Sequence, residues 1–89
     1  EVLVLCDLLG GTPFKVASTI MGNRPDLQMN VLSGLNLAML LETVFARMTL
    51  SFDEVAEKAV AAAHSGVVNG RELFSDDSEV IEEDFESGI

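Results

Sequence analysis

A carboxylate and two adjacent glycines stand close together near the start of the sequence. Asp7 follows an apolar run, Gly10 and Gly11 come shortly after it, and Thr12-Pro13 opens a helical pattern. Open parallel sheets place their ligand sites at the carboxyl ends of their strands. A helix start favours an anion through its free amides and its dipole. The segment therefore predicts an anion-binding corner with a carboxylate beside it.

Each residue of this corner has both a chemical and a purely structural interpretation. Asp7 can orient an imidazole by accepting its ring N–H, or it can cap the following loop or pair with a nearby base. Gly10 and Gly11 let backbone amides approach a ligand, but a plain turn between strand and helix also uses glycine. The Thr12 hydroxyl can cap the helix, donate to a phosphate oxygen, or do both. No nucleophile lies near the corner in the sequence.

The elements that must position this corner follow from the hydrophobic pattern. Residues 2–6 are apolar throughout, which predicts a parallel strand buried on both faces. Four further elements are expected: a helix over 13–21 with Thr12 as its N-cap, a less buried strand over 27–32, an almost wholly apolar and deeply packed helix over 37–48 capped by Asn36, and a helix from the capping box of Ser51 and Glu54 to Gly66. Residues 67–74 fit either a short last strand or an irregular connector. This order predicts an α/β fold in which helices flank a parallel, Rossmann-like open sheet.

The predicted first strand requires more neighbours than the sequence supplies. Two parallel strands cannot bury residues 2–6 on both faces and at both edges. The chain also begins at Glu1 without an initiator Met. Either another chain provides the missing neighbours, or an upstream part of the domain is absent from this sequence, and the lack of an initiator Met favours the second interpretation.

Composition narrows the class of protein. The 89 residues allow one small domain, and the net charge of −10 is concentrated between residues 76 and 86, which include seven acidic side chains and no basic one. We therefore divide the chain into a folded body over 1–75 and an acidic, disordered tail over 76–89. The acidic balance argues against nucleic acid and against anionic membrane surfaces as partners.

The lone cysteine and the lone histidine both receive structural interpretations. Cys6 lies inside the apolar strand and reads as a small buried hydrophobe of a cytoplasmic protein without disulfides. His64 lies near the end of the last predicted helix and has no ligand-type residue at metal-binding spacing, so no metal site is expected. No signal peptide and no apolar run long enough to span a bilayer is present.

Three blocks of the sequence together resemble a known family. Residues 7–14 resemble the Asp-x-x-Gly-Gly-(Ser/Thr)-Pro-Phe signature of the mannose-family enzyme IIA domains of the bacterial sugar phosphotransferase system. Residues 33–42 resemble the second block of that family, and residues 51–54 resemble the start of its last helix. The resemblance covers residues 1–74, and it departs from the family at Lys15, where an Asn is usual.

The resemblance implies a phosphoryl carrier that needs no cofactor. Such a domain takes phosphate from the histidine phosphocarrier protein onto its own histidine and passes it to a IIB partner that serves the sugar permease complex. The sequence begins at what resembles the family's third strand, so the resemblance implies that the sheet lacks its first two strands here. The family's phosphorylated histidine lies upstream of this motif, so the resemblance also implies that it is missing here and that this fragment alone is inactive. Asp7 would orient that histidine as a catalytic residue together with Thr12.

The same resemblance implies further site residues and an assembly. Gly10, Gly11 and Thr12 would surround the phosphoryl group, while Leu9, Leu35 and Asn36 would line the rim of the site. The family forms homodimers by exchanging a C-terminal strand, which would correspond to residues 67–74 here. Membrane contact would be indirect, through the permease complex.

Two other classes of function remain open at this stage. A non-catalytic regulatory or interaction module could retain the fold without phosphoryl transfer. An independent nucleotide-binding α/β protein is disfavoured because the sequence has neither a Gly-x-Gly-x-x-Gly nor a Gly-Lys-Ser/Thr element.

Overall fold

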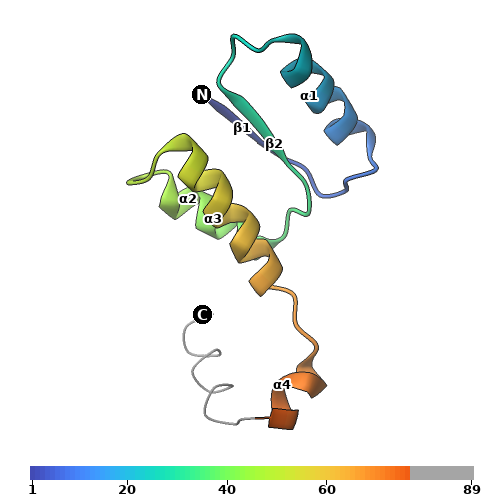
Figure 1. The fold of residues 1–89 in the computed structure, drawn as a ribbon. Helices are drawn as coiled ribbons and strands as arrows, with labels where there is room; N and C mark the ends of the chain where they lie inside the picture. Colours follow the sequence, from blue (N-terminus) through green and yellow to red (C-terminus); the bar gives the residue numbers. More distant parts are fainter. Residues whose placement is uncertain (77–89) are drawn as a thin grey trace.

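The computed structural model describes residues 1–76 as two strands and four helices (Figure 1). The elements in chain order are β1 (Val2–Leu5), α1 (Thr12–Asn23), β2 (Met29–Leu32), α2 (Leu37–Ala46), α3 (Phe52–Ser65) and α4 (Gly70–Asp76). All but the first residue of the predicted acidic tail lie outside the described residues. No helix in the described part of the chain combines the length and apolar character needed to cross a bilayer.

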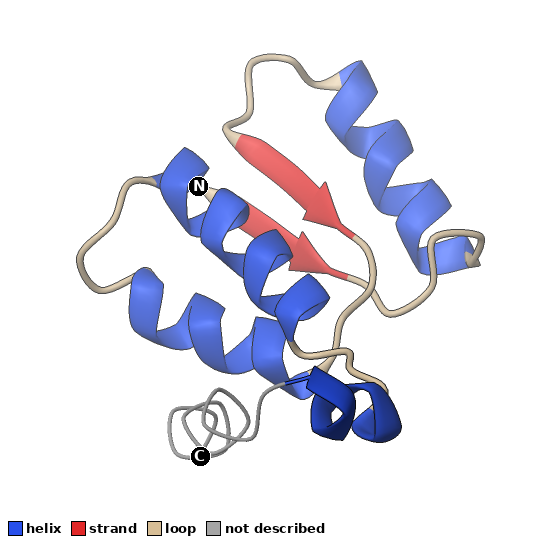
Figure 2. Ribbon diagram, turned by 60° about the horizontal axis from the view of Figure 1, so that its bottom comes forward, coloured by secondary structure: helices blue, strands red, loops and turns tan. Residues whose placement is uncertain are grey.

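The two strands are parallel and lie between two layers of helices (Figure 2). Val2 pairs with Met29, and the register continues to the pair of Leu5 and Leu32. Helix α1 covers one face of the sheet, and α2 and α3 lie on the other. The structure thus confirms the α/β class and the parallel pairing.

The uniformly apolar first strand reflects this layering. Val4 and Cys6 pack toward the cluster of Ala17 and Val31, whereas Leu3 and Leu5 pack toward the cluster that contains Met39. Because successive side chains of a strand point to opposite faces, a sheet covered on both sides needs apolar residues at every position.

The prediction that this strand is fully buried was wrong at its start. Cys6 is buried, but Val2 is 55% exposed and the middle of the strand is half-buried. The reason is that β1 has one neighbouring strand, β2, within residues 1–76.

The helix starts were predicted correctly in two of three cases. Asn36 caps α2, with its Oδ1 accepting the Met39 N–H at 2.9 Å, and Ser51 and Glu54 form a complete capping box at α3. Thr12 is not the N-cap of α1. Gly11 holds that position in extended backbone and its carbonyl accepts the Lys15 N–H, so the helix begins one residue earlier than expected.

Helix α2 is far more exposed than its apolar sequence predicted. Leu37 is 69% exposed and Phe45 is 66% exposed, whereas Met39 and Ala46 are buried. In the described structure α2 packs mainly on α3, so only one side of an almost wholly apolar helix is covered. The expectation of deep packing was therefore wrong.

The segment over residues 67–74 does not form the short strand that the sequence allowed. Residues 67–69 form a connector, and α4 begins at Gly70. The Asn69 side chain accepts the Arg71 N–H at 3.1 Å, which satisfies a free amide of the first turn and favours the helix.

Candidate functional site

The predicted corner lies where β1 ends. Asp7 comes two residues after the last residue of β1, and its side chain is exposed. Within residues 1–76 its carboxylate has no hydrogen-bond or ion-pair partner. Two interpretations of Asp7, as a cap of the following loop and as the partner of a nearby basic side chain, therefore find no support in this part of the chain. The carboxylate can accept a hydrogen bond from a donor outside it.

The chain turns between this carboxylate and α1. The Gly11 N–H donates to the Leu8 carbonyl at 3.2 Å, which closes a tight turn. No backbone hydrogen bond in the described structure uses the N–H of Thr12 or Phe14. These two amides belong to the first turn of α1, where the helix dipole favours an anion.

The backbone conformation of the turn does not require glycine at position 10 or 11. The φ angle of neither lies in the left-handed region, and a Cβ built on Gly10 meets no atom within 4 Å. A Cβ on Gly11 would lie 3.4 Å from the Leu8 carbonyl oxygen, which is an ordinary contact. The glycines therefore leave open space at the corner that other residues would fill.

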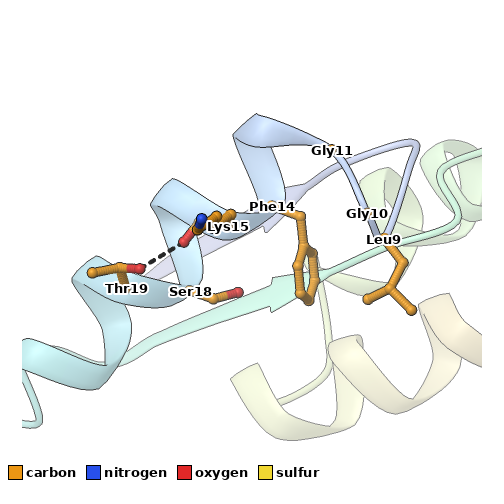
Figure 3. A pocket seen from close by; sticks show the side chains of 7 residues that line it. All are labelled: Leu9, Gly10, Gly11, Phe14, Lys15, Ser18 and Thr19. Atoms are coloured by element: carbon orange, nitrogen blue, oxygen red, sulfur yellow. Dashed lines mark hydrogen bonds between the residues drawn. The ribbon is translucent and has the colours of Figure 1, made fainter.

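An open pocket of about 460 Å³ lies beside the glycines (Figure 3). Leu9 and Phe14 project into the same region from the turn and from α1, and Lys15 continues the lining along the helix. The volume lies within the range of small-ligand sites. Asp7 and Thr12 do not line this pocket, so the structure joins only part of the predicted site in one depression.

Two residues of the pocket were missed by the sequence reading. Ser18 and Thr19 lie one turn beyond Phe14 and Lys15 on the same face of α1 (Figure 3). The signal available in the sequence was that Ser18 follows Phe14, and Thr19 follows Lys15, by four residues, which places each pair on one face of a helix. The Thr19 hydroxyl donates to the Lys15 carbonyl at 2.8 Å, whereas the Ser18 hydroxyl is buried and has no partner among the described residues.

The predicted rim residues Leu35 and Asn36 turn inward. The Leu35 side chain is half-buried against the core cluster, and its N–H donates to the Cys6 carbonyl at 3.0 Å. Asn36 is half-buried and lines a second pocket of about 480 Å³ together with His64. Leu9, by contrast, is 65% exposed at the corner.

The charges near the corner are few. The Lys15 ammonium has no acidic partner in the described part of the chain, so its charge stays available beside the first pocket. The ion pair of Arg24 and Asp26, at 2.9 Å, is exposed and lies in the turn after α1, where the guanidinium lowers the pKa of the Asp26 carboxyl. Residues 1–76 contain no group of three or more side chains that could hold a metal ion.

Comparison with known proteins gives consistent matches. The sequence profile described as EIIA-man, PTS system fructose IIA component, matches residues 1–60. The chain is 42% identical over 67 residues to the PTS system mannose-specific EIIAB component of Escherichia coli (strain K12), a match that covers 74% of this chain and 20% of that protein. It is 36% identical over 55 residues to the PTS system fructose-specific EIIA component of Bacillus subtilis (strain 168), covering 62% of this chain and 36% of that protein.

A solved structure matches as well. The crystal structure of phosphotransferase system component EIIA from Streptococcus agalactiae superposes with a TM-score of 0.75 at 44% sequence identity. The match covers 81% of this chain and 56% of that one. The chain thus spans about a fifth of the Escherichia coli protein and just over half of the solved structure.

Proposed function

We propose that this chain, which belongs to the mannose-type EIIA family of the phosphotransferase system, forms part of a phosphoryl carrier in sugar uptake. In this proposal the complete protein receives phosphate from the histidine phosphocarrier protein and passes it to a IIB partner. The accepting histidine lies outside this sequence. In the same proposal the complete protein works in the cytoplasm as a homodimer and contacts the membrane only through the permease complex.

The observation that carries the proposal is the Asp7 carboxylate at the end of β1, which has no hydrogen-bond or ion-pair partner within residues 1–76. A carboxylate in this position can accept the N–H of one imidazole nitrogen and leave the other nitrogen's lone pair free to attack phosphorus. The new N–P bond forms as the donor's N–P bond breaks, and the donor imidazole keeps the electron pair of the broken bond. Asp7 stabilises the positive charge that develops on the phosphorylated ring.

The start of α1 supplies the phosphoryl contacts in this proposal. The Thr12 hydroxyl, which has no hydrogen bond within the described residues, and the free amides of Thr12 and Phe14 donate to phosphoryl oxygens. Gly10 and Gly11 contribute space for the approach, because the Gly11 amide is already bound to Leu8. His64 is not assigned as the acceptor, since the pocket that it lines does not include Asp7.

Phosphorylation of the complete protein that carries this sequence tests the proposal. With the phosphocarrier system present, we expect an acid-labile phosphate on a histidine. Asp7→Asn should slow formation of this phosphohistidine about 10–100-fold, by analogy with the loss of a carboxylate partner from a metal-ligating histidine. Glu57→Gln, which removes an exposed carboxylate from α3, serves as the matched control and should change nothing. Absence of label, or an unchanged rate in Asp7→Asn, would contradict the proposal and favour the interaction module.

A further inference from the structure

The loop over residues 33–36 is fastened at both of its ends. At its start, the Gly34 N–H donates to the Asp7 carbonyl at 3.1 Å and the Leu35 N–H donates to the Cys6 carbonyl at 3.0 Å. These two bonds lie just beyond the last pair of β1 and β2 and join the loop directly to the backbone of Asp7 and Cys6, so the backbone that carries the Asp7 side chain is held by the segment that follows β2. Gly34 has a φ of +80°, which a residue with a Cβ adopts at a cost.

Asn36 fastens the other end of the loop. Its Oδ1 accepts the Met39 N–H at 2.9 Å at the start of α2, and its Nδ2 donates to the Ala63 carbonyl at 3.1 Å near the end of α3. The two partners are 24 residues apart in the sequence, and both bonds are partly buried. One side chain thus ties the loop to two helices at once.

Asparagine suits this pair of hydrogen bonds better than the other N-cap residues. Serine can cap α2 but has no second group that reaches Ala63. Aspartate would set a carboxylate oxygen against the Ala63 carbonyl, where both groups are acceptors. Leu35, which stands between Asn36 and the strand end, packs against the core cluster between these two attachments of the loop.

We infer that Asn36 is a positioning residue for Asp7 and not a contact on the rim of the site. It anchors the loop, the loop holds the backbone at the end of β1, and that backbone fixes the position from which the Asp7 side chain extends. The inference deepens the proposed function and rests on it only for the effect on phosphoryl transfer. Its structural part, that Asn36 holds Asp7 in place, stands on the hydrogen bonds alone.

The test compares four variants of the complete protein. Asn36→Ala removes both bonds, and Asn36→Ser keeps a cap for α2 but loses the bond to Ala63. Ser51→Ala is the matched control, because it removes an N-cap from α3 at the end opposite to Ala63. Asp7→Asn reports on the proposed function by itself.

Three readouts separate positioning from general stability. Amide hydrogen exchange at Gly34 and Leu35 should accelerate on the order of 10-fold in both Asn36 variants, because the loop opens locally. The carboxyl ¹³C signal of Asp7 should shift in both. Phosphorylation should slow about 10-fold, since small displacements of an orienting group have effects of this size or larger. Ser51→Ala should leave the Asp7 signal and the phosphorylation rate unchanged.

The outcomes distinguish the two claims. If Gly34 and Leu35 stay protected and the Asp7 signal does not move in the Asn36 variants, the inference is wrong whatever the phosphorylation rates are. If both change in the Asn36 variants but Asp7→Asn transfers phosphate at the normal rate, the positioning is confirmed and the proposed function fails. A slow Asp7→Asn with a normal rate in both Asn36 variants also overturns the inference.

Discussion

Gly66 is expected to resist even the smallest enlargement, although it lies on the surface. It ends α3 at the point where that helix approaches the start of α2. A Cβ at this position would lie 2.8 Å from the Cβ of Ala38, 3.3 Å from the Ala62 carbonyl oxygen and 3.5 Å from the Asn36 Nδ2. The Ala38 methyl group is attached directly to the backbone, so it cannot rotate away. Gly66→Ala therefore requires the two helices to move apart.

The magnitude follows from two opposing effects. Unstrained carbon–carbon contacts lie at about 3.5–4.0 Å, so the helices must separate by roughly 0.7 Å or more. Overpacking of this kind costs about 1–3 kcal/mol. The backbone at Gly66, with φ −78° and ψ −5°, accepts alanine without strain, and loss of a glycine from the unfolded chain returns about 0.4–1 kcal/mol. We expect a net destabilisation of about 1 kcal/mol.

The control is a glycine with empty space around it. Gly22 lies in the last turn of α1, and its Cβ would meet nothing within 4 Å. Gly22→Ala should stabilise the protein by about 0.5–1 kcal/mol, so the two equivalent substitutions have opposite signs. Urea unfolding followed by circular dichroism measures both, since the chain contains no Trp or Tyr for fluorescence.

A double substitution makes the test sharper. In an Ala38→Gly background the clashing methyl group is absent, so Gly66→Ala should lose most of its cost. The reasoning is refuted if Gly66→Ala is as stable as Gly22→Ala, or if its cost is the same with and without the Ala38 methyl group.

Three further predictions concern other parts of the chain. Gly10→Ala should leave the urea midpoint unchanged or slightly raised, because its Cβ meets nothing, yet it should slow phosphorylation of the complete protein if the corner receives the phosphoryl group. The Ser51 hydroxyl donates to the Glu54 carboxylate at 2.7 Å and lowers the pKa of Glu54 below its ordinary value of 4.5. The stabilisation is therefore present above pH 4.5 and lost as pH falls through the lowered pKa. Glu54→Gln should lower the free energy of unfolding at neutral pH, and the difference from the unsubstituted protein should shrink in acid. Met39→Ala should lower the free energy of unfolding in urea by about 2–5 kcal/mol, because Met39 is 1% exposed and its truncation leaves a cavity in the core. A loss below about 1 kcal/mol would contradict the packing described for Met39.

The sequence predicted well where a short segment carries its own physical cause. Ser51 and Glu54 form a capping box because the two side chains and two amides involved lie within four residues. Asn36 caps α2 for the same reason. The apolar run before Asp7 indicated a strand covered on both faces, and the structure has helices on both sides of it.

The errors arose where the outcome depends on what lies next to a segment. The apolar sequence of α2 predicted deep burial, but burial depends on partners, and in residues 1–76 α2 has one main neighbour. Residues 67–74 could have been strand or connector by pattern, and the Asn69 side chain favours a helix instead. At α1, Gly11 replaces Thr12 as the N-cap because its extended backbone already presents the first carbonyl to the helix.

By itself, the sequence determined the chemistry that is available: an acid after an apolar strand, two glycines, and a threonine hydroxyl at a helix start. These are local properties, set by residue type and by spacings of a few positions. Only the tertiary structure decided that the Asp7 carboxylate has no partner in the described chain, that Lys15 shares a pocket with the glycines, and that Asn36 joins α2 to α3. Asn36 and Ala63 are 27 residues apart, and no short-range pattern records a hydrogen bond that exists only once two helices have packed together.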